Sequence, residues 1–159
     1  MKTSQAGIDL IKEFEGLRLR AYPDPLTGGA PYTCGYGCAN PSISPDTVWT
    51  QDYAEQRLKD DLTSFEGMVN KAVYVALTQG QFDALVSITF NVGPGSTKKD
   101  GIIMLRTGHP STLLACVNRC EYDKAAGQFL RWVSPGSSVE AGLRRRREAE
   151  RALFVGVPA

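Results

Sequence analysis

The stretch EGLRLRAYPDPLTGGAPYTCGYGC, residues 15–38, constrains the fold of this chain more than any other segment. The segment before it, SQAGIDLIKEF, places apolar residues at helical spacing, with Ser4 as a candidate N-cap and Gly16 as a stop. Glu15 is therefore expected at the C-terminal end of a helix. There the negative end of the helix dipole and apolar neighbours favour a neutral carboxyl, which could act as a general acid. Nearby arginines would oppose this if their side chains reached Glu15.

A second carboxylate follows at Asp24. The residues LRLRAY alternate with period two, as in a half-exposed strand, and the prolines at 23 and 25 end that strand and hold Asp24 on a stiff segment. LTGGA predicts a turn and PYTCGYG a return strand, so the piece should form a small β-hairpin unit. Two carboxyls in different environments are what cleavage of a glycosidic bond requires. A helix-terminal Glu and a turn Asp are also common surface residues.

The pattern resembles the phage-type lysozymes of glycoside hydrolase family twenty-four. Their signature is a Glu at the end of a first helix, then EG-L-R-L-x-AY, an Asp, and TIGYGH, and the matching residues here are Glu15, Asp24 and Thr33. FNVGPGS, STLL, FLRW and LRRRREAERALF match further motifs in the family's order. The resemblance implies an α+β, lysozyme-like fold, with a small β-hairpin lobe and a larger helical lobe joined by a long helix.

The resemblance also implies a reaction, the hydrolysis of the β-1,4 bond between N-acetylmuramic acid and N-acetylglucosamine in peptidoglycan. Glu15 would protonate the leaving oxygen, and Asp24 with Thr33 would activate a water on the opposite face of the sugar, which predicts inversion. A covalent retaining route is the weaker option. A lytic transglycosylase, for which only Glu15 matters, and a catalytically inactive peptidoglycan-binding module are alternative functions.

Substrate contacts are implied at Phe90, Asn91 and, more loosely, Thr112, although a purely structural Phe90 fits the sequence equally well. Two features depart from the family's pattern. LTGGAPY widens the hairpin between Asp24 and Thr33, and TCGYGC replaces TIGYGH. Cys38 therefore stands where many members have a His that helps to fasten the small lobe.

The chain has 159 residues, which suits a single lysozyme domain. The small lobe is expected at about residues 15–50 and the helical lobe at about 51–159, with helix 4–15 packed on it. After the hairpin, apolar periodicity predicts helices at about 50–73, 78–93, 111–117, 122–133 and 139–154. Thr78-Gln79-Gly80-Gln81 fits a capping box for the second of these, and Gly93 is its expected stop. Residues 93–110 are expected to be a loop or a brief hairpin.

The net charge is +1, so no strong field directs this chain to nucleic acid or to a membrane. No secretory signal and no apolar run of about 18 residues is present, so we expect no stable membrane insertion. The interpretation is a monomer made in the host cytoplasm that acts on periplasmic peptidoglycan after release. The Arg144–Arg147 block has glutamates at i,i+4 spacing, which favours a solvated, paired face over a nucleic-acid patch. The resemblance implies that one arginine of this block turns toward Glu15.

The cysteines form two pairs of equal spacing, Cys34/Cys38 and Cys116/Cys120. Free buried thiols are the expectation, with a four-thiolate zinc site or a disulfide between the pairs as alternatives. His109, the only histidine, has no sequence partner for a triad or a metal site. We therefore expect no cofactor and no metal. Trp132 is interpreted as a core residue rather than a sugar platform.

Overall fold

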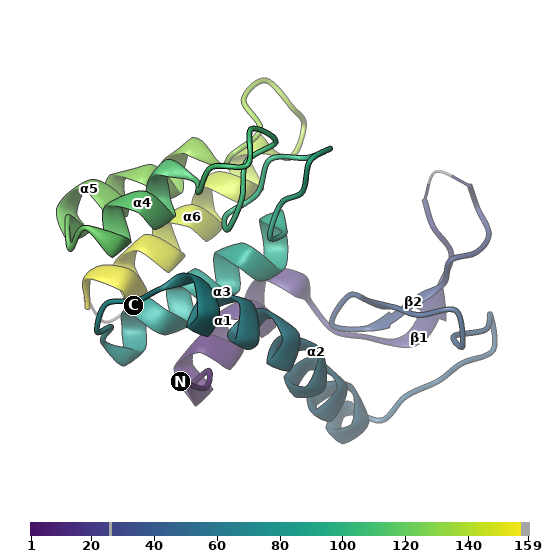
Figure 1. The fold of residues 1–159 in the computed structure, drawn as a ribbon. Helices are drawn as coiled ribbons and strands as arrows, with labels where there is room; N and C mark the ends of the chain where they lie inside the picture. The colour runs from purple at the N-terminus through teal and green to yellow at the C-terminus, as the bar shows by residue number, and fades with distance from the viewer. Residues whose placement is uncertain (26, 157–159) are drawn as a thin grey trace. The chain divides into compact units, whose positions relative to one another are not determined.

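The computed structural model describes residues 1–25 and 27–156 and combines helices with a small antiparallel sheet (Figure 1). The elements are α1 (Gln5–Glu15), β1 (Arg18–Tyr22), β2 (Thr33–Gly35), β3 (Cys38–Ala39), α2 (Gln51–Ala72), α3 (Gln79–Val92), α4 (Thr112–Asn118), α5 (Tyr122–Gln128), a 3₁₀ turn η1 (Phe129–Arg131) and α6 (Glu140–Val155). The predicted α+β class is confirmed. Leu26, in the expected LTGGA turn, and the last three residues of the expected helical lobe lie outside the described residues.

The chain divides into two compact units. One is Ile11–Thr63, and the other combines Met1–Leu10 with the described residues from Ser64 onward. The dividing points fall inside α1 and inside α2, so both helices contribute residues to both units. Within the described residues, no helix is both long and apolar enough to cross a membrane.

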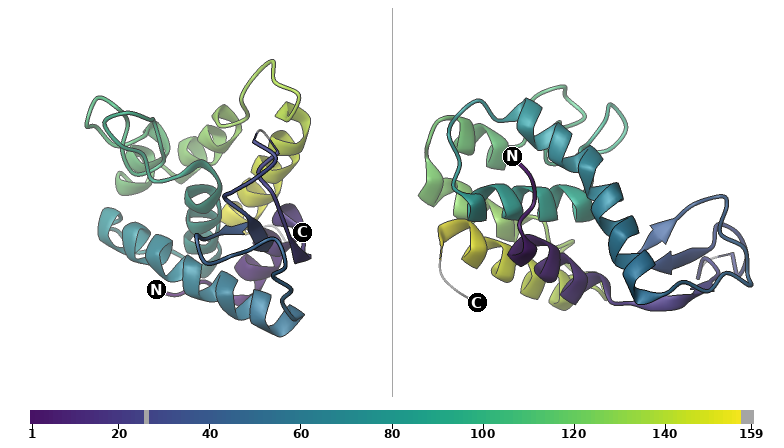
Figure 2. Two further views of the ribbon diagram at one scale, coloured as in Figure 1. Left: turned by 90° about the vertical axis from the view of Figure 1, so that its right-hand side faces the viewer. Right: turned by 90° about the horizontal axis from the view of Figure 1, so that it is seen from below.

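The unit Ile11–Thr63 is built on the sheet β1-β2-β3, in which both neighbouring pairs are antiparallel (Figure 2). The predicted return strand PYTCGYG is a strand only at Thr33–Gly35 (β2), because the chain turns after Gly35 and then forms β3 beyond the predicted segment. Gly35 and Gly37 have φ of 69° and 84°, a left-handed conformation that glycine adopts without steric cost. The segment after the hairpin returns to β1, where Trp49 N donates to Leu19 O at 2.8 Å.

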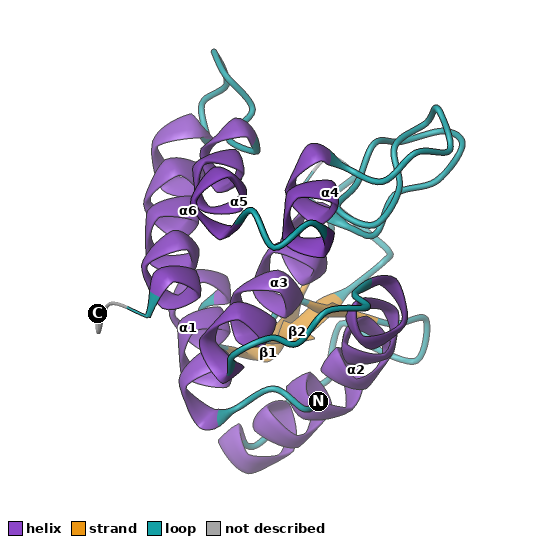
Figure 3. Cartoon of the chain, turned by 60° about the vertical axis from the view of Figure 1, so that its left-hand side comes forward, coloured by secondary structure: helices purple, strands orange, loops and turns teal. Residues whose placement is uncertain are grey.

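The helical unit is organised around α3, whose residues 81–89 are all buried. The predicted capping box is present, since Thr78 Oγ1 accepts from Gln81 N and the Gln81 side chain accepts from Thr78 N. The helix ends at Gly93, as expected. Helix α6 packs against α3, and α4 and α5 pack against each other (Figure 3). The loop 93–110 contains no strand, although backbone hydrogen bonds such as Gly101 N to Met104 O order it.

The N-terminal segment of the same unit is attached through two buried carboxylates. Asp83 on α3 accepts hydrogen bonds from Ser4 N, at 3.0 Å, and from Ser4 Oγ. Glu66 accepts from Thr3 N and pairs with Lys2 Nζ, each at 2.8 Å. Ser4 is the predicted cap of α1, since its Oγ accepts from Gly7 N at 3.4 Å. Asp83 therefore holds the capping residue in place.

Candidate active site

Glu15 is the last residue of α1, as the sequence predicts. Gly16 ends the helix in the left-handed conformation, and its N–H donates to Lys12 O at 3.1 Å. The Glu15 carboxyl is half-buried and lies against the turn between β2 and β3. A Cβ placed on Gly37 would be 3.3 Å from Glu15 Oε2. The turn thus places Gly37, which has no side chain, next to the Glu15 carboxyl.

Asp24 is half-buried and lies just beyond the end of β1. Its side chain starts the following loop, because Asp24 Oδ1 accepts from Thr27 N at 2.9 Å. Its backbone is also held, with Asp24 N donating to Gly29 O at 2.9 Å and Asp24 O accepting from Gly28 N at 2.8 Å. These three hydrogen bonds add to the restriction that the flanking prolines impose.

Thr33 is half-buried and opens β2 as the register partner of Tyr22. Because Tyr22 precedes Asp24 by two residues, the wide loop leaves from Asp24 and returns to the sheet near the same end of β1. Glu15, Asp24 and Thr33 all belong to the compact unit Ile11–Thr63.

Lys12 supports this arrangement, and sequence analysis did not single it out. Lys12 Nζ forms an ion pair with Glu55 Oε1 at 2.6 Å and lies 5.6 Å from the centre of the Tyr36 ring. Gln51 Nε2 donates to the same Glu55 oxygen at 3.0 Å. The hydrogen bonds from Lys12 and then Gln51 lower the pKa of Glu55. Lys12 thereby connects α1, one turn before Glu15, with Tyr36, the residue before Gly37.

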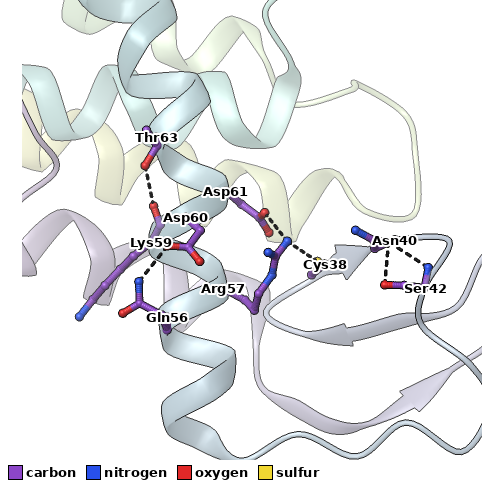
Figure 4. A network of polar contacts seen from close by, with 9 residues as sticks. All are labelled: Cys38, Asn40, Ser42, Gln56, Arg57, Lys59, Asp60, Asp61 and Thr63. Atoms are coloured by element: carbon purple, nitrogen blue, oxygen red, sulfur yellow. Dashed lines mark hydrogen bonds and ion pairs between the residues drawn. The ribbon is translucent and has the colours of Figure 1, made fainter.

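Cys38, at the position where many members of the resembled family have a His, contacts Arg57 of α2 (Figure 4). Arg57 Nη2 donates to Cys38 Sγ at 3.9 Å and to Asp61 Oδ1 at 3.1 Å. Burial raises the pKa of the Cys38 thiol, and the hydrogen bond from Arg57 opposes part of that rise. A neutral thiol with a guanidinium partner thus occupies this place.

The residues with implied substrate contacts lie in the helical unit. Asn91, near the end of α3, is half-buried, and its Oδ1 accepts from Arg147 Nη2 at 2.6 Å. The Phe90 ring meets the Phe65 ring edge to face at 5.2 Å. Thr112 is exposed at the start of α4. Trp132, predicted as a core residue rather than a sugar platform, is half-buried and lines a hollow of about 430 Å³ together with Asn91.

The arginine block of α6 corrects another expectation. Arg144 pairs with Glu140 at 3.0 Å on the surface, as predicted. Arg146 and Arg147 are instead buried around Glu150, at 3.2 and 3.1 Å. The prediction of a solvated face is wrong for Arg146 and Arg147. Glu150, with which they pair, points toward α3, where Ser87 Oγ donates to it at 2.7 Å. Burial raises the pKa of Glu150, and Arg147 and Arg146 oppose the rise.

The remaining sequence candidates do not form a second site. All four cysteines are free thiols, of which Cys34 and Cys116 are buried and Cys120 is exposed. His109 is exposed in the loop after α3. In the part of the chain that the structure describes, no group of three or more His, Cys, Asp and Glu side chains is arranged to hold a metal ion.

Comparison with known proteins gives consistent matches. The family profile named Phage lysozyme matches residues 12–150. The endolysin of Bacillus phage B103 is 44% identical over 98% of this chain, and the endolysin of Salmonella phage P22 is 35% identical over 98%. The match covers 54% of the B103 protein and 99% of the P22 protein. This chain thus spans about half of the length of the Bacillus phage relatives, B103 and PZA.

Two solved structures resemble this chain in fold. The muramidase domain of SpmX from Asticaccaulis excentricus has a TM-score of 0.79 at 36% identity, covering 97% of each chain. A mutant P22 lysozyme has a TM-score of 0.77 at 33% identity, covering 98% of this chain and 99% of that one.

Proposed function

The chain belongs to the phage lysozyme family and has its lysozyme-like fold, and from this premise we propose that it is an endolysin that hydrolyses bacterial peptidoglycan. The bond cleaved is the β-1,4 link between N-acetylmuramic acid and N-acetylglucosamine. The relatives are named endolysins and a structural neighbour is a muramidase domain, which supports this activity.

The observation that carries the proposal is the position of Glu15. Glu15 is the last residue of α1 and is half-buried, and its Oε2 would lie 3.3 Å from a Cβ on Gly37, so the turn presents the backbone of that glycine to the carboxyl. Such a group is suited to transfer a proton to a bound glycosidic oxygen. Asp24 and Thr33 lie in the same compact unit, which supports their role as its partners.

In the proposed mechanism, Glu15 donates its proton to the leaving glycosidic oxygen. Asp24 acts as the ionised base and, with the Thr33 hydroxyl, orients a water for attack on the anomeric carbon from the opposite face. The hydrogen bond from Thr27 N holds the Asp24 carboxylate in a fixed orientation. Inversion follows if the carboxyl groups are about 6.5–9.5 Å apart, whereas about 5 Å would favour a covalent retaining route.

The remaining parts of the proposal concern binding and location. Phe90, Asn91 and Thr112 would contact the glycan. The chain would act as one monomeric lysozyme domain, with the lobes at about residues 15–50 and 51–159. It would be made in the host cytoplasm and reach peptidoglycan after release, without a cofactor.

Replacement of the proposed acid tests the activity. Glu15→Gln should abolish the loss of turbidity of permeabilised Gram-negative cells, since an amide cannot supply the proton, while the circular dichroism spectrum and melting temperature stay unchanged. Glu13→Gln is the matched control, because Glu13 is exposed on the same helix, and it should keep full activity. A fully active, folded Glu15→Gln protein would remove Glu15 from the mechanism.

The products distinguish the alternatives. Mass spectrometry of fragments released from defined peptidoglycan should show reducing muramic acid ends. Fragments with a 1,6-anhydro ring would identify a lytic transglycosylase that needs Glu15 but not Asp24. Sedimentation with peptidoglycan without any released fragments would identify a binding module.

A further inference from the structure

Cys34 and Cys38 are direct register partners in the antiparallel pair β2–β3. Such partners have Cα atoms about 4.5 or 5.5 Å apart, and their side chains project from the same face of the sheet. Disulfides join residues whose Cα atoms are about 4.4–6.8 Å apart. The hairpin register therefore places the Cα atoms of the two cysteines in the range that a disulfide spans, and each side chain must rotate away from its present partners for the sulfurs to meet.

The turn between them can make the small closing movement that a bond requires. Paired Cβ atoms are about 4.5–5.5 Å apart in a ladder, and a disulfide draws them to about 3.5–4.5 Å. The connection is Gly35-Tyr36-Gly37, with both glycines in the left-handed conformation. Among the described residues, and apart from its chain neighbours, Glu15 Oε2 is the one atom within 4 Å of a Cβ built on Gly37, whereas a Cβ on Gly35 would lie 2.8 Å from Trp49, so the turn has room to move on the Gly37 side.

The two sulfurs differ in access. Cys38 is half-buried, and its Sγ accepts a hydrogen bond from Arg57. Cys34 is fully buried, and its Sγ donates to Arg18 O and Leu19 O at 3.4 and 3.5 Å. A reagent in solution therefore meets Cys38 first, and Cys34 is the neighbouring thiol that can resolve the adduct.

We propose that Cys34 and Cys38 are a modification site that forms a reversible intramolecular disulfide across β2 and β3, closing the turn beside Glu15. The oxidant is a low-molecular-weight disulfide. The Cys38 thiolate attacks one of its sulfurs, which forms a mixed disulfide and releases the first small thiolate. Cys34 then loses its proton and attacks Cys38 Sγ, which releases the second. Two protein thiols are oxidised, and the small disulfide is reduced to two thiols.

The environment of Cys38 sets the pH dependence of this exchange. Burial raises the pKa of Cys38, Arg57 opposes the rise and Asp61 adds to it. Because the thiolate is the nucleophile, oxidation should be slow at neutral pH and faster as the pH increases.

The test uses the full chain and oxidised glutathione at mildly alkaline pH. The product should be lighter by two hydrogen atoms, and two of its four cysteines should no longer react with an alkylating agent after unfolding. Chymotrypsin cleaves after Tyr36, between the two cysteines, so the fragments should stay joined until a reductant is added. The readout does not depend on wall hydrolysis, so it stands apart from the proposed function.

Two variants complete the experiment. Cys38→Ser should abolish the linked fragments, and Cys120→Ser, which removes an exposed thiol elsewhere, should retain them. The proposal is overturned if glutathione remains bound to Cys38 while Cys34 is still alkylated, if covalent dimers form through Cys38, or if Cys38→Ser loses the same two hydrogen atoms as the unmodified sequence.

Discussion

The two compact units hold their charged groups in different ways. In Ile11–Thr63, the ion pairs Lys12–Glu55 and Arg57–Asp61 are partly exposed to solvent. The helical unit also has surface pairs such as Arg144–Glu140, but its Arg146, Arg147 and Glu150 are almost completely buried. Partly exposed pairs contribute about 0–1 kcal/mol each, whereas breaking a buried pair costs about 3–5 kcal/mol. Substitutions of the buried charges in the helical unit should therefore mainly lower stability, and substitutions near Glu15 in the unit Ile11–Thr63 should mainly lower activity.

The largest effect is expected at Glu150. Glu150→Ala removes the carboxylate shared by two buried guanidinium groups, so the free energy of unfolding should fall by about 3–5 kcal/mol. Urea denaturation followed by circular dichroism measures it. The control is Glu148→Ala, an exposed position on the same helix, which should change the free energy by less than about 0.5 kcal/mol. An equal loss of unfolding free energy in both variants would show that the buried cluster contributes no more to stability than an exposed glutamate does.

In the unit Ile11–Thr63, a substitution at Gly37 should affect activity more than stability. Gly37→Ala forces a Cβ into a left-handed position, 3.3 Å from Glu15 Oε2, so wall hydrolysis should fall by about 10- to 100-fold through displacement of that carboxyl. The free energy of unfolding should fall by only about 1–2 kcal/mol.

Gly108→Ala is the matched variant, with φ of 81° and no neighbour within 4 Å of the added Cβ. It should lose similar stability and retain activity. An equal loss of hydrolysis in both variants would attribute the effect of Gly37 to backbone strain alone.

A smaller effect concerns acid stability. Burial would raise the pKa of Glu66, but hydrogen bonds from Lys2 and Thr3 outweigh it, and the net pKa is lowered from the ordinary value of 4.5. A lowered pKa in the folded state adds stability at pH values above 4.5, and this is lost as the pH falls through the folded value. Glu66→Gln should therefore flatten the decline of melting temperature below pH 4.5. An unchanged slope would contradict this role.

Local signals predicted much of the fold. The helix end at Glu15, the capping box at Thr78 and the stop at Gly93 follow from residues that are neighbours in the sequence. The end of the return strand at Gly35 and the turn to β3 were missed, although Gly35 and Gly37 on either side of Tyr36 were the available signal.

Contacts between distant segments could not be read from local patterns. The buried cluster of Arg146, Arg147 and Glu150 is bonded to α3 through Ser87, which donates to Glu150, and Asn91, which accepts from Arg147, both more than fifty positions away. The support of Ser4 by Asp83 likewise joins separate helices. In the candidate site, local signals indicated Glu15 and Asp24 and the family resemblance added Thr33, but Lys12 and Arg57 carried no motif that would have revealed their contacts.

The anomeric form of the first product tests the central claim most directly, because it reports from which face water reaches the sugar. A soluble peptidoglycan oligosaccharide would be digested inside the magnet, and proton NMR would follow the new reducing end before mutarotation. The account predicts that the α anomer appears first, as expected if Glu15 protonates one face and Asp24 delivers water to the other. A β anomer as the first product would contradict that division of roles.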